Sequence, residues 1–250
     1  MRRLRFAFRL LRRILQGEFP SFRVGRCPFC GPTAFMKYGE NEFAVRCLRC
    51  GSNSVTLSIG SALIREAPDL AKRHVYEVSS RSALARCLRK HAGRVTLSQY
   101  FEDVPLGEFK DGVQCQDVQR LTYPDACFDI CTSSEVFGHV ANDSMGFREM
   151  YRVLKPGGLL LFTVPLSGAE KTRERARLTE NGIEHILEPS YHDDPILGTR
   201  TALTFRDYGM DIVDRLERAG FVRCRVIQSE DVAGCGFARR VVSARVESRA

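Results

Sequence analysis

Two apolar runs joined by a helical segment constrain the fold of this chain more than any other feature of its sequence. Residues 128–133 form an apolar run of strand length, and residues 159–164 have the composition of a strand buried on both faces. Between them, residues 147–154 carry apolar side chains at helical spacing. The Lys-Pro-Gly-Gly sequence at 155–158 ends this helix, because proline blocks its continuation and glycine tolerates a positive φ. This order of elements predicts a parallel β–α–β unit, and therefore an α/β fold.

Further segments extend this unit along the chain in both directions. Hydrophobic patterning predicts strands at 74–78 and 95–98, a short strand ending at 115–117, and helices at 63–71, 83–91 and 207–219. Two alternating segments near the C-terminus predict a closing antiparallel pair of strands, at 221–229 and 240–246. A mixed charge run at 171–177 has helical spacing and indicates a solvated helix face.

The central part of the chain resembles a known enzyme family. The residues that carry the similarity are Asp117, the run Pro124-Asp125-x-x-Phe128-Asp129, Glu135, His139 and the string Arg152-Val153-Leu154-Lys155-Pro156-Gly157-Gly158. They resemble the latter half of a class I S-adenosylmethionine-dependent methyltransferase of the type 11-like group, and the similarity extends over residues 72–245, more weakly beyond 166. The resemblance implies a Rossmann-like, doubly wound, mostly parallel sheet with an antiparallel last strand. It also implies an enzyme that uses S-adenosylmethionine as its cofactor.

Four cysteines upstream of this region form two Cys-x-x-Cys knuckles. Cys27 and Cys30 are separated by 16 residues from Cys47 and Cys50, a spacing that suits one tetrahedral Zn²⁺ bound by four thiolates. A glycine follows each second cysteine and fits the tight turn that such a knuckle needs. Four sulfur ligands leave no open coordination position, so the expected zinc is structural and not catalytic. The alternative is a set of free or redox-active thiols.

Positive charge is concentrated at the N-terminus. The net charge of the chain is +8, and residues 1–26 contain eight arginines and one glutamate, so the remainder is nearly neutral. Residues 1–20 have the pattern of a basic amphipathic helix, which can lie on an anionic membrane, dock on the body of the protein or act as a transit peptide. No stretch is apolar enough to span a bilayer or to form a secretory signal. We therefore expect a cytoplasmic protein with peripheral membrane contact through residues 1–20.

By resemblance, the cofactor site lies at the carboxyl ends of the strands. The acidic residue after the first strand is Glu77, but the positions where the family has glycines hold other residues. The cofactor contacts that the resemblance implies are Glu77, Ser79, Arg81, Ser98, Gln99, Asp117, Val118 and Ser133. Asp117 takes the position that accepts from the adenine amino group, whereas Ser98 and Gln99 stand where a carboxylate usually binds the ribose. Arg81 can pair with the carboxylate of the cofactor.

Methyl transfer to a hydroxyl requires an aligned acceptor and a group that removes its proton. Glu135 and His139 follow the strand after which the family's catalytic residues usually lie, and the alternative for them is a structural i,i+4 pair. An insert at residues 166–204 is expected to form a substrate lid. It contains His185 and His192, which are candidate bases or, with neighbouring aspartates, candidate metal ligands.

These observations predict three parts: an amphipathic helix at 1–20, a zinc ribbon at 21–60 and a methyltransferase-like domain at 61–250. The expected activity is methyl transfer to an oxygen or nitrogen atom of a small molecule or a membrane-associated saccharide. Nucleic acid is a less favoured partner, because a phosphate backbone requires a distributed basic surface and the body is nearly neutral. Two alternatives stay open, a zinc-ribbon RNA methyltransferase and a non-catalytic scaffold with a degenerate cofactor site.

Overall fold

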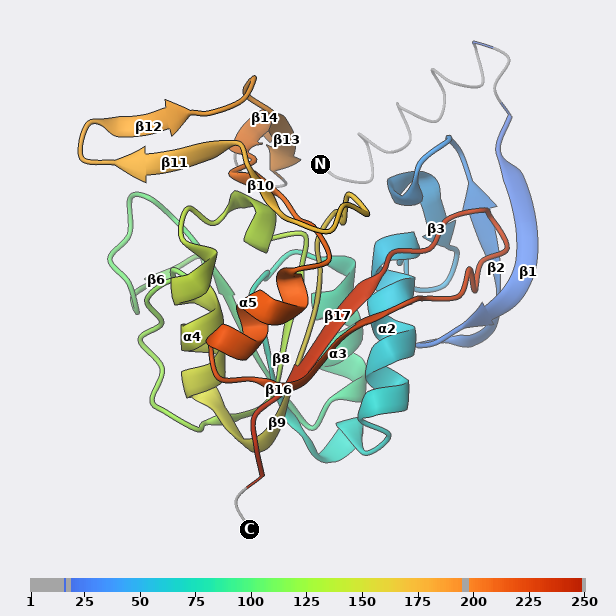
Figure 1. Ribbon diagram of the computed structural model, residues 1–250. Coiled ribbons are helices and arrows are strands. Elements are labelled where there is room, and N and C mark those ends of the chain that lie inside the picture. Colours follow the sequence, from blue (N-terminus) through green and yellow to red (C-terminus); the bar gives the residue numbers. More distant parts are fainter. Residues whose placement is uncertain (1–15, 17–18, 195–197, 249–250) are drawn as a thin grey trace.

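The computed structural model of the chain describes residues 16, 19–194 and 198–248, and it has a layered α/β arrangement (Figure 1). Within these residues, eight strands form one central sheet in the order β16-β17-β9-β8-β4-β5-β7-β6. Its parallel core consists of β4 (His74–Glu77), β5 (Arg94–Gln99), β7 (Val113–Cys115), β8 (Phe128–Ser134) and β9 (Leu154–Thr163). These strands confirm those predicted from the apolar runs.

Antiparallel strands complete the sheet at both ends. At one end β17 (Val241–Arg245) pairs antiparallel with β9, and β16 (Val222–Ile227) pairs antiparallel with β17. At the other end the short strand β6 (Phe109–Lys110) pairs antiparallel with β7. The mostly parallel sheet with an antiparallel last strand confirms the expected Rossmann-like fold class.

Helices cover both faces of the central sheet. One face carries α2 (Ser54–Glu66) and α3 (Ala83–His91), and the other carries α4 (Asp143–Val153) and α5 (Ile212–Arg218). Successive strand residues point to opposite faces, so Ile130 packs with the α2–α3 side and Cys131 packs with the α4–α5 side. Three short 3₁₀ helices lie in the connections, η1 (Glu42–Ala44), η2 (Leu70–Lys72) and η3 (Phe137–His139).

A small antiparallel sheet precedes the central one. It contains β1 (Ser21–Cys27), β2 (Gly31–Lys37) and β3 (Val45–Cys47), in that order, and we call these strands with their connecting turns the ribbon. Phe35 and Val45 of the ribbon are fully buried in the same hydrophobic cluster as Leu57 of α2 and Leu84 of α3. The ribbon therefore shares one core with the α/β part of the chain, and α2 runs across residue 60, where the sequence placed a boundary.

The helix predicted at residues 1–20 falls almost entirely on residues 1–15 and 17–18, which lie outside the described part of the chain. No helix in the described ranges is both long enough and apolar enough to cross a membrane.

The helix predicted at 63–71 is wrong in its position, because α2 begins and ends earlier. The side chain of Asn53 caps its first turn by accepting from the Thr56 amide at 2.9 Å. The helix ends at Glu66, and Ala67 has an extended φ of −140°. Pro68 follows directly, and proline disfavours helical conformation in the residue before it.

The helix face predicted at 171–177 is also wrong, since this segment forms strands. Here β10 (Arg173–Glu174) pairs with β15 (Arg206–Asp207), and β11 (Ala176–Thr179) pairs with β12 (Gly182–His185). Arg173 and Arg175 both donate to Asp207 Oδ2, at 3.0 and 2.7 Å. The strand conformation is thus stabilised by partners about thirty residues away. The periodicity of side chains within the segment contains no information about these partners.

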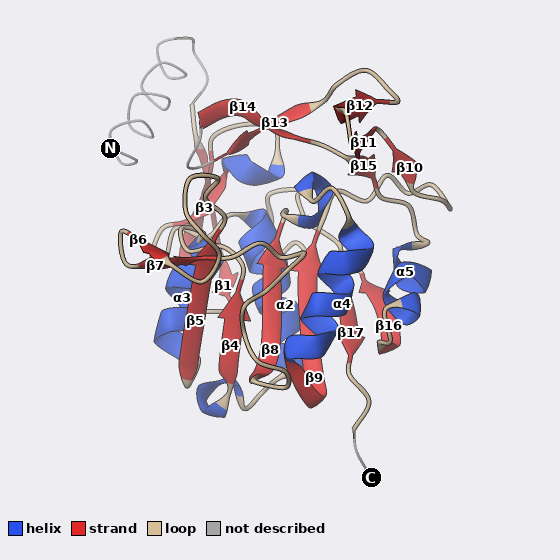
Figure 2. Ribbon diagram, turned by 90° about the vertical axis from the view of Figure 1, so that its left-hand side faces the viewer, coloured by secondary structure: helices blue, strands red, loops and turns tan. Residues whose placement is uncertain are grey.

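The segment from β10 to β15, which we call the cap, also contains a hairpin of β13 (Tyr191–Asp194) and β14 (Gly198–Leu203). Figure 2 shows the cap above the carboxyl ends of β4, β5, β8 and β9. The predicted insert therefore lies at the edge of the sheet where a lid was expected.

Gly60 allows the ribbon to approach α2 closely. A Cβ atom at this position would lie 2.5 Å from the ring of Phe29, which is itself buried. We expect Gly60→Ala to destabilise the protein by about 1–3 kcal/mol, despite the higher helix propensity of alanine, because the ring has little room to move. Urea denaturation measures the effect, and Ser61→Ala on the same helix is the matched control. Equal or greater stability of the Gly60 variant would contradict this packing.

Candidate functional site

The parallel strands β4 and β8 end side by side beneath the cap (Figure 2), and polar side chains lie at these strand ends. Glu77 is the last residue of β4 and its side chain is fully buried. Thr132 of β8 donates to Glu77 Oε2 at 2.6 Å, and Ser82 donates to Oε1 at 3.2 Å. Ser82 also caps α3, because its Oγ accepts from the Ala85 amide at 2.9 Å. The Glu77 carboxyl group thus joins two strands to the N-terminus of α3.

Burial raises the pKa of Glu77 to about 8, against the lowering effect of hydrogen bonds from Thr132, Ser82 and the Ser79 amide. A carboxyl group in this position is largely protonated at neutral pH. It can donate a hydrogen bond when protonated and attract a cation when ionised.

This raised pKa predicts a pH dependence of stability. An acid whose pKa rises on folding binds more protons in the folded state, so its stabilising effect is present at low pH and is lost as pH rises towards about 8. We expect the wild type to lose at least about 1 kcal/mol relative to Glu77→Gln between about pH 5.5 and about pH 8.5. Urea denaturation at the two pH values measures this difference. The exposed carboxylate variant Glu102→Gln is the control, and parallel pH profiles for the wild type and Glu77→Gln would refute the prediction.

Several buried polar atoms at the carboxyl ends of β4 and β8 have no hydrogen-bond partner among the described residues. They are the hydroxyl oxygens of Ser80, Ser133 and Ser134, together with Oε1 of Glu135. Ser80 follows β4, and the other three residues lie at or just after the end of β8. Buried polar groups are normally satisfied, so this set marks a place where a polar ligand would find partners. The chemistry of the edge therefore fits a polar nucleoside cofactor.

Glu135 has an unusual backbone and a charged partner. Its φ is +60°, in the left-handed region that non-glycine residues seldom adopt, and such strain is common at functional sites. Arg239, in the loop between β16 and β17, donates to Glu135 Oε2 at 3.2 Å and also pairs with Glu42 of the ribbon. Burial raises the pKa of Glu135, while the positive charge of Arg239 lowers it.

The other residues assigned to the cofactor by resemblance are distributed unevenly along this edge. Ser98 is buried and shares a 2.8 Å hydrogen bond with the Tyr76 hydroxyl, so its oxygen faces the protein interior. Asp117 Oδ1 accepts from the amide and the side chain of Gln119, in a local turn. The remaining positions range from exposed to buried: Arg81 is exposed, Ser79 and Gln99 are half-buried, and Val118 and Ser133 are buried.

Two histidines from distant parts of the chain meet at the cap. The rings of His139 and His192 have centroids 5.1 Å apart, in an edge-to-face arrangement. His139 Nδ1 donates to the carbonyl oxygen of Leu203 at 2.8 Å. The i,i+4 alternative for Glu135 and His139 is wrong, because the chain between them forms a left-handed residue and a 3₁₀ turn and not an α-helix. His185 lies on the exposed strand β12, and the side chains of the aspartates after His192 lie outside the described part.

The four cysteines of the two knuckles form one compact cluster. The Sγ atoms of Cys27, Cys30, Cys47 and Cys50 all lie within 4.8 Å of one another, and those of Cys27 and Cys50 are 3.8 Å apart. Four sulfurs at about 2.3 Å from one tetrahedral zinc would be about 3.8 Å apart, so the cluster fits Zn²⁺. Ser52 lies 3.1 Å from Cys50 Sγ and 3.5 Å from Cys87 Sγ, and this links the cluster to α3.

Sequence reasoning did not identify Arg239, Glu42 or Thr132 as parts of this region. Arg239 lies in a loop without a motif, and its position depends on the ribbon, on Ser58 of α2 and on Glu135. The sequence contains a weak indication that Thr132 belongs to the site, because a polar residue in the middle of a buried strand requires a hydrogen-bond partner.

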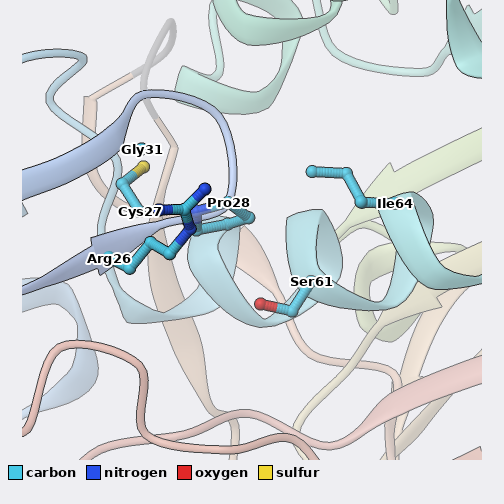
Figure 3. A pocket seen from close by; sticks show the side chains of 6 residues that line it. All are labelled: Arg26, Cys27, Pro28, Gly31, Ser61 and Ile64. Carbon is cyan, nitrogen blue, oxygen red and sulfur yellow. The ribbon is translucent and has the colours of Figure 1, made fainter. Parts of the chain in front are cut away.

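A cavity of about 360 Å³ lies outside this edge, between the first knuckle and α2 (Figure 3). Its lining consists of Arg26, Cys27, Pro28, Gly31, Ser61 and Ile64. None of these residues belongs to the carboxyl edge, so the cavity is separate from the candidate site.

Comparison with known proteins agrees with this geometry. Residues 57–162 match the methyltransferase domain family. The demethylmenaquinone methyltransferase of Deinococcus radiodurans is 41% identical over 83 residues, which are 32% of this chain and 30% of that protein. The ubiquinone biosynthesis O-methyltransferase of Coxiella burnetii is 30% identical over 109 residues, which are 40% of this chain and 47% of that protein. The chain thus spans less than half the length of these two relatives.

A solved structure extends the comparison to most of the chain. The crystal structure of an S-adenosylmethionine-dependent methyltransferase from Mesorhizobium loti superposes with a TM-score of 0.50 at 17% identity, covering 75% of this chain and 97% of that one. At this identity the likeness concerns the fold. Residues 57–162 are therefore similar to a methyltransferase domain, and the fold of the chain is that of the S-adenosylmethionine-dependent methyltransferases.

Proposed function

We propose that this protein transfers a methyl group from S-adenosylmethionine to an oxygen or nitrogen atom of a small-molecule acceptor. The observation that carries the proposal is the convergence of Glu77 with unpartnered buried hydroxyls at the carboxyl edge of β4 and β8. This edge falls within the segment that matches the methyltransferase domain. In open α/β sheets such an edge is the usual ligand site.

Residues of this chain would hold the cofactor at that edge. Glu77 and the N-terminus of α3 offer a carboxyl group and the positive end of a helix dipole, which suit the cationic and anionic ends of an amino acid. Ser79, Arg81 and Ser133 would contact the cofactor from the ends of β4 and β8, and Asp117 and Val118 would contact the adenine. When bound, S-adenosylmethionine supplies an electrophilic methyl group.

The remaining task of the protein is to orient the acceptor and remove its proton. Glu135 is the proposed base, because its Oε1 is buried without a partner at the end of β8. His139 and His192 lie together at the cap and would contact the acceptor or relay its proton to solvent. Menaquinone and ubiquinone enzymes among the relatives favour a small molecule over a saccharide as the acceptor.

The parts outside the matched domain have proposed roles of their own. Zn²⁺ bound by the four knuckle cysteines would stabilise the ribbon. The basic segment at 1–20 would hold a cytoplasmic enzyme against an anionic membrane. The proposed boundaries near residues 20 and 60 would divide these roles along the chain, although α2 continues across residue 60.

Titration calorimetry of the zinc-loaded protein with S-adenosylmethionine tests the proposal. We expect saturable binding of one cofactor per chain and competition by S-adenosylhomocysteine. A mixture of acceptor candidates with radiolabelled cofactor then tests transfer. The enzymatic proposal would be refuted if the cofactor produced no heat, no thermal shift and no crosslink with the protein. The scaffold alternative would then remain.

A further inference from the structure

The ribbon has an outward face that differs from an ordinary polar surface. Strand register places side chains in cross-strand rows, since directly opposed residues of antiparallel strands share a face. Phe22 is opposite Met36, which is opposite Arg46. In the next row Val24 is opposite Ala34, and the Leu48 amide donates to the Ala34 carbonyl and continues that row. We call this face, completed by Arg26 and Pro32, the outer ribbon face.

Large apolar side chains on the outer ribbon face are exposed to solvent. The exposed fractions are 56% for Phe22, 90% for Val24 and 52% for Leu48. The opposite face holds Phe35 and Cys47, which are buried against α2 and α3. Figure 1 shows β1 at the outside of the molecule, away from the central sheet. Met36, between Phe22 and Arg46, is only 8% exposed, so the exposed apolar side chains of this face are Phe22, Val24 and Leu48 around the half-buried Ala34. Apolar side chains that are exposed together on a protein surface indicate an interaction site.

Cationic side chains accompany these apolar residues. Arg46 belongs to the outer ribbon face but is half-buried, and its guanidinium donates to the backbone carbonyls of Phe43 and Val45. Arg26 is exposed beside the cavity in Figure 3. Within the described residues, no carboxylate forms an ion pair with either arginine. The partner of this face should therefore combine an apolar layer with negative charge.

We propose that the outer ribbon face docks on an anionic lipid membrane. A lipid interface offers an apolar layer for Phe22, Val24 and Leu48 next to phosphate groups for the arginines. The Arg-rich sequence at 1–13 precedes β1 directly and carries the same sign of charge, so it is attracted to the same surface. A nucleic acid would use the arginines but would leave the aliphatic side chains in water.

This inference extends the proposed membrane contact of residues 1–20 to the folded ribbon, and that contact is part of the proposed function. The exposed apolar side chains of the ribbon would add an apolar contribution to the free energy of membrane binding. Contact through the basic segment alone does not require this contribution. Binding should therefore persist, although weakened, at salt concentrations that screen the arginines.

Sedimentation of the full-length, zinc-loaded protein with lipid vesicles tests the proposal. The vesicles contain phosphatidylcholine alone or phosphatidylcholine with phosphatidylglycerol. We expect Val24→Ser/Leu48→Ser to lower the partition coefficient on the anionic vesicles by about tenfold, since both side chains are exposed and their loss leaves the core intact. Phe109→Ser/Leu178→Ser is the matched control, because these side chains are 68% and 64% exposed outside the ribbon. The control should bind like the wild type.

Other occupants of the face give other results. Unchanged vesicle binding of Val24→Ser/Leu48→Ser would overturn the proposal, and a lowered melting temperature in that variant would indicate an intramolecular cover. Loss of binding to an RNA oligonucleotide, with vesicle binding unchanged, would overturn it in favour of a nucleic acid. If arginine-to-glutamine changes at residues 2–13 abolish vesicle binding while the serine pair does not, only the ribbon inference fails. No cofactor is needed in these assays, so they are independent of methyl transfer.

Discussion

Removing zinc is expected to lower the melting temperature of the whole chain by more than about 10 °C, and Cys47→Ser should have the same effect. Cys47 is 1% exposed and lies in the hydrophobic cluster that also contains residues of α2, α3 and the central sheet. Unfolding of the ribbon would expose Leu57 and Leu84 to water, so the loss of stability should spread to the α/β part of the chain. Scanning calorimetry with and without a chelator measures it, and one cooperative transition is expected.

The control for this prediction is Cys224→Ser. Cys224 is half-buried on β16 and lies outside the knuckle cluster, so its replacement should change the melting temperature by only a few degrees. Metal analysis should find one zinc per chain in the wild type and in this control, but not in Cys47→Ser. A chelated protein that melts like the untreated one would show that the ribbon does not depend on a metal.

Replacing the proposed base should have the second large effect. We expect Glu135→Gln to lower the rate of methyl transfer by about 100-fold or more, with the dissociation constant of S-adenosylmethionine little changed. The amide has nearly the same shape as the carboxyl group but cannot accept the proton. Single-turnover kinetics together with calorimetry separate the two quantities. A proportional loss of cofactor affinity would assign Glu135 to binding and not to proton transfer.

Arg239, which donates directly to Glu135, should affect the pKa of this base. Its positive charge lowers the pKa of Glu135, so Arg239→Met should raise that pKa further. Since the base acts in its ionised form, the rising limb of the pH–rate profile should move to higher pH. Arg240→Met is the matched control, because Arg240 contacts Gln228 and not Glu135. An unchanged pH profile in Arg239→Met would remove Glu135 as the titrating base.

Local patterns predicted the elements that position the site. The helix expected at 83–91 is α3 with the same bounds, because Ser82 caps it and its apolar residues repeat at helical spacing. The strand expected at 128–133 is β8, and the Pro-Gly-Gly turn has Gly157 at a φ of +75°. These features depend on residues that are neighbours in the sequence, so the sequence carries their full signal.

The patterns failed where distant partners decide the conformation. The segment at 171–177 has helical spacing, but its arginines pair with Asp207, and it forms strands. The resemblance assigned Ser98 to the cofactor site. In the structure the Ser98 hydroxyl instead shares a hydrogen bond with Tyr76, because β5 packs beside β4. The net charge of the body does not locate any surface patch, because a sum over residues contains no information about which side chains share a face.

The sequence by itself determined the strands of the parallel core, helix α3, the α/β fold class and the grouping of four cysteines into one cluster, since each depends on short-range spacing. Only the tertiary structure decided that Arg239 meets Glu135, that His139 meets His192, and that Phe22, Val24 and Leu48 share the outer ribbon face. These residues lie in loops and on separate strands. Their positions are set by packing between segments, where the free energy depends on contacts that no single segment encodes.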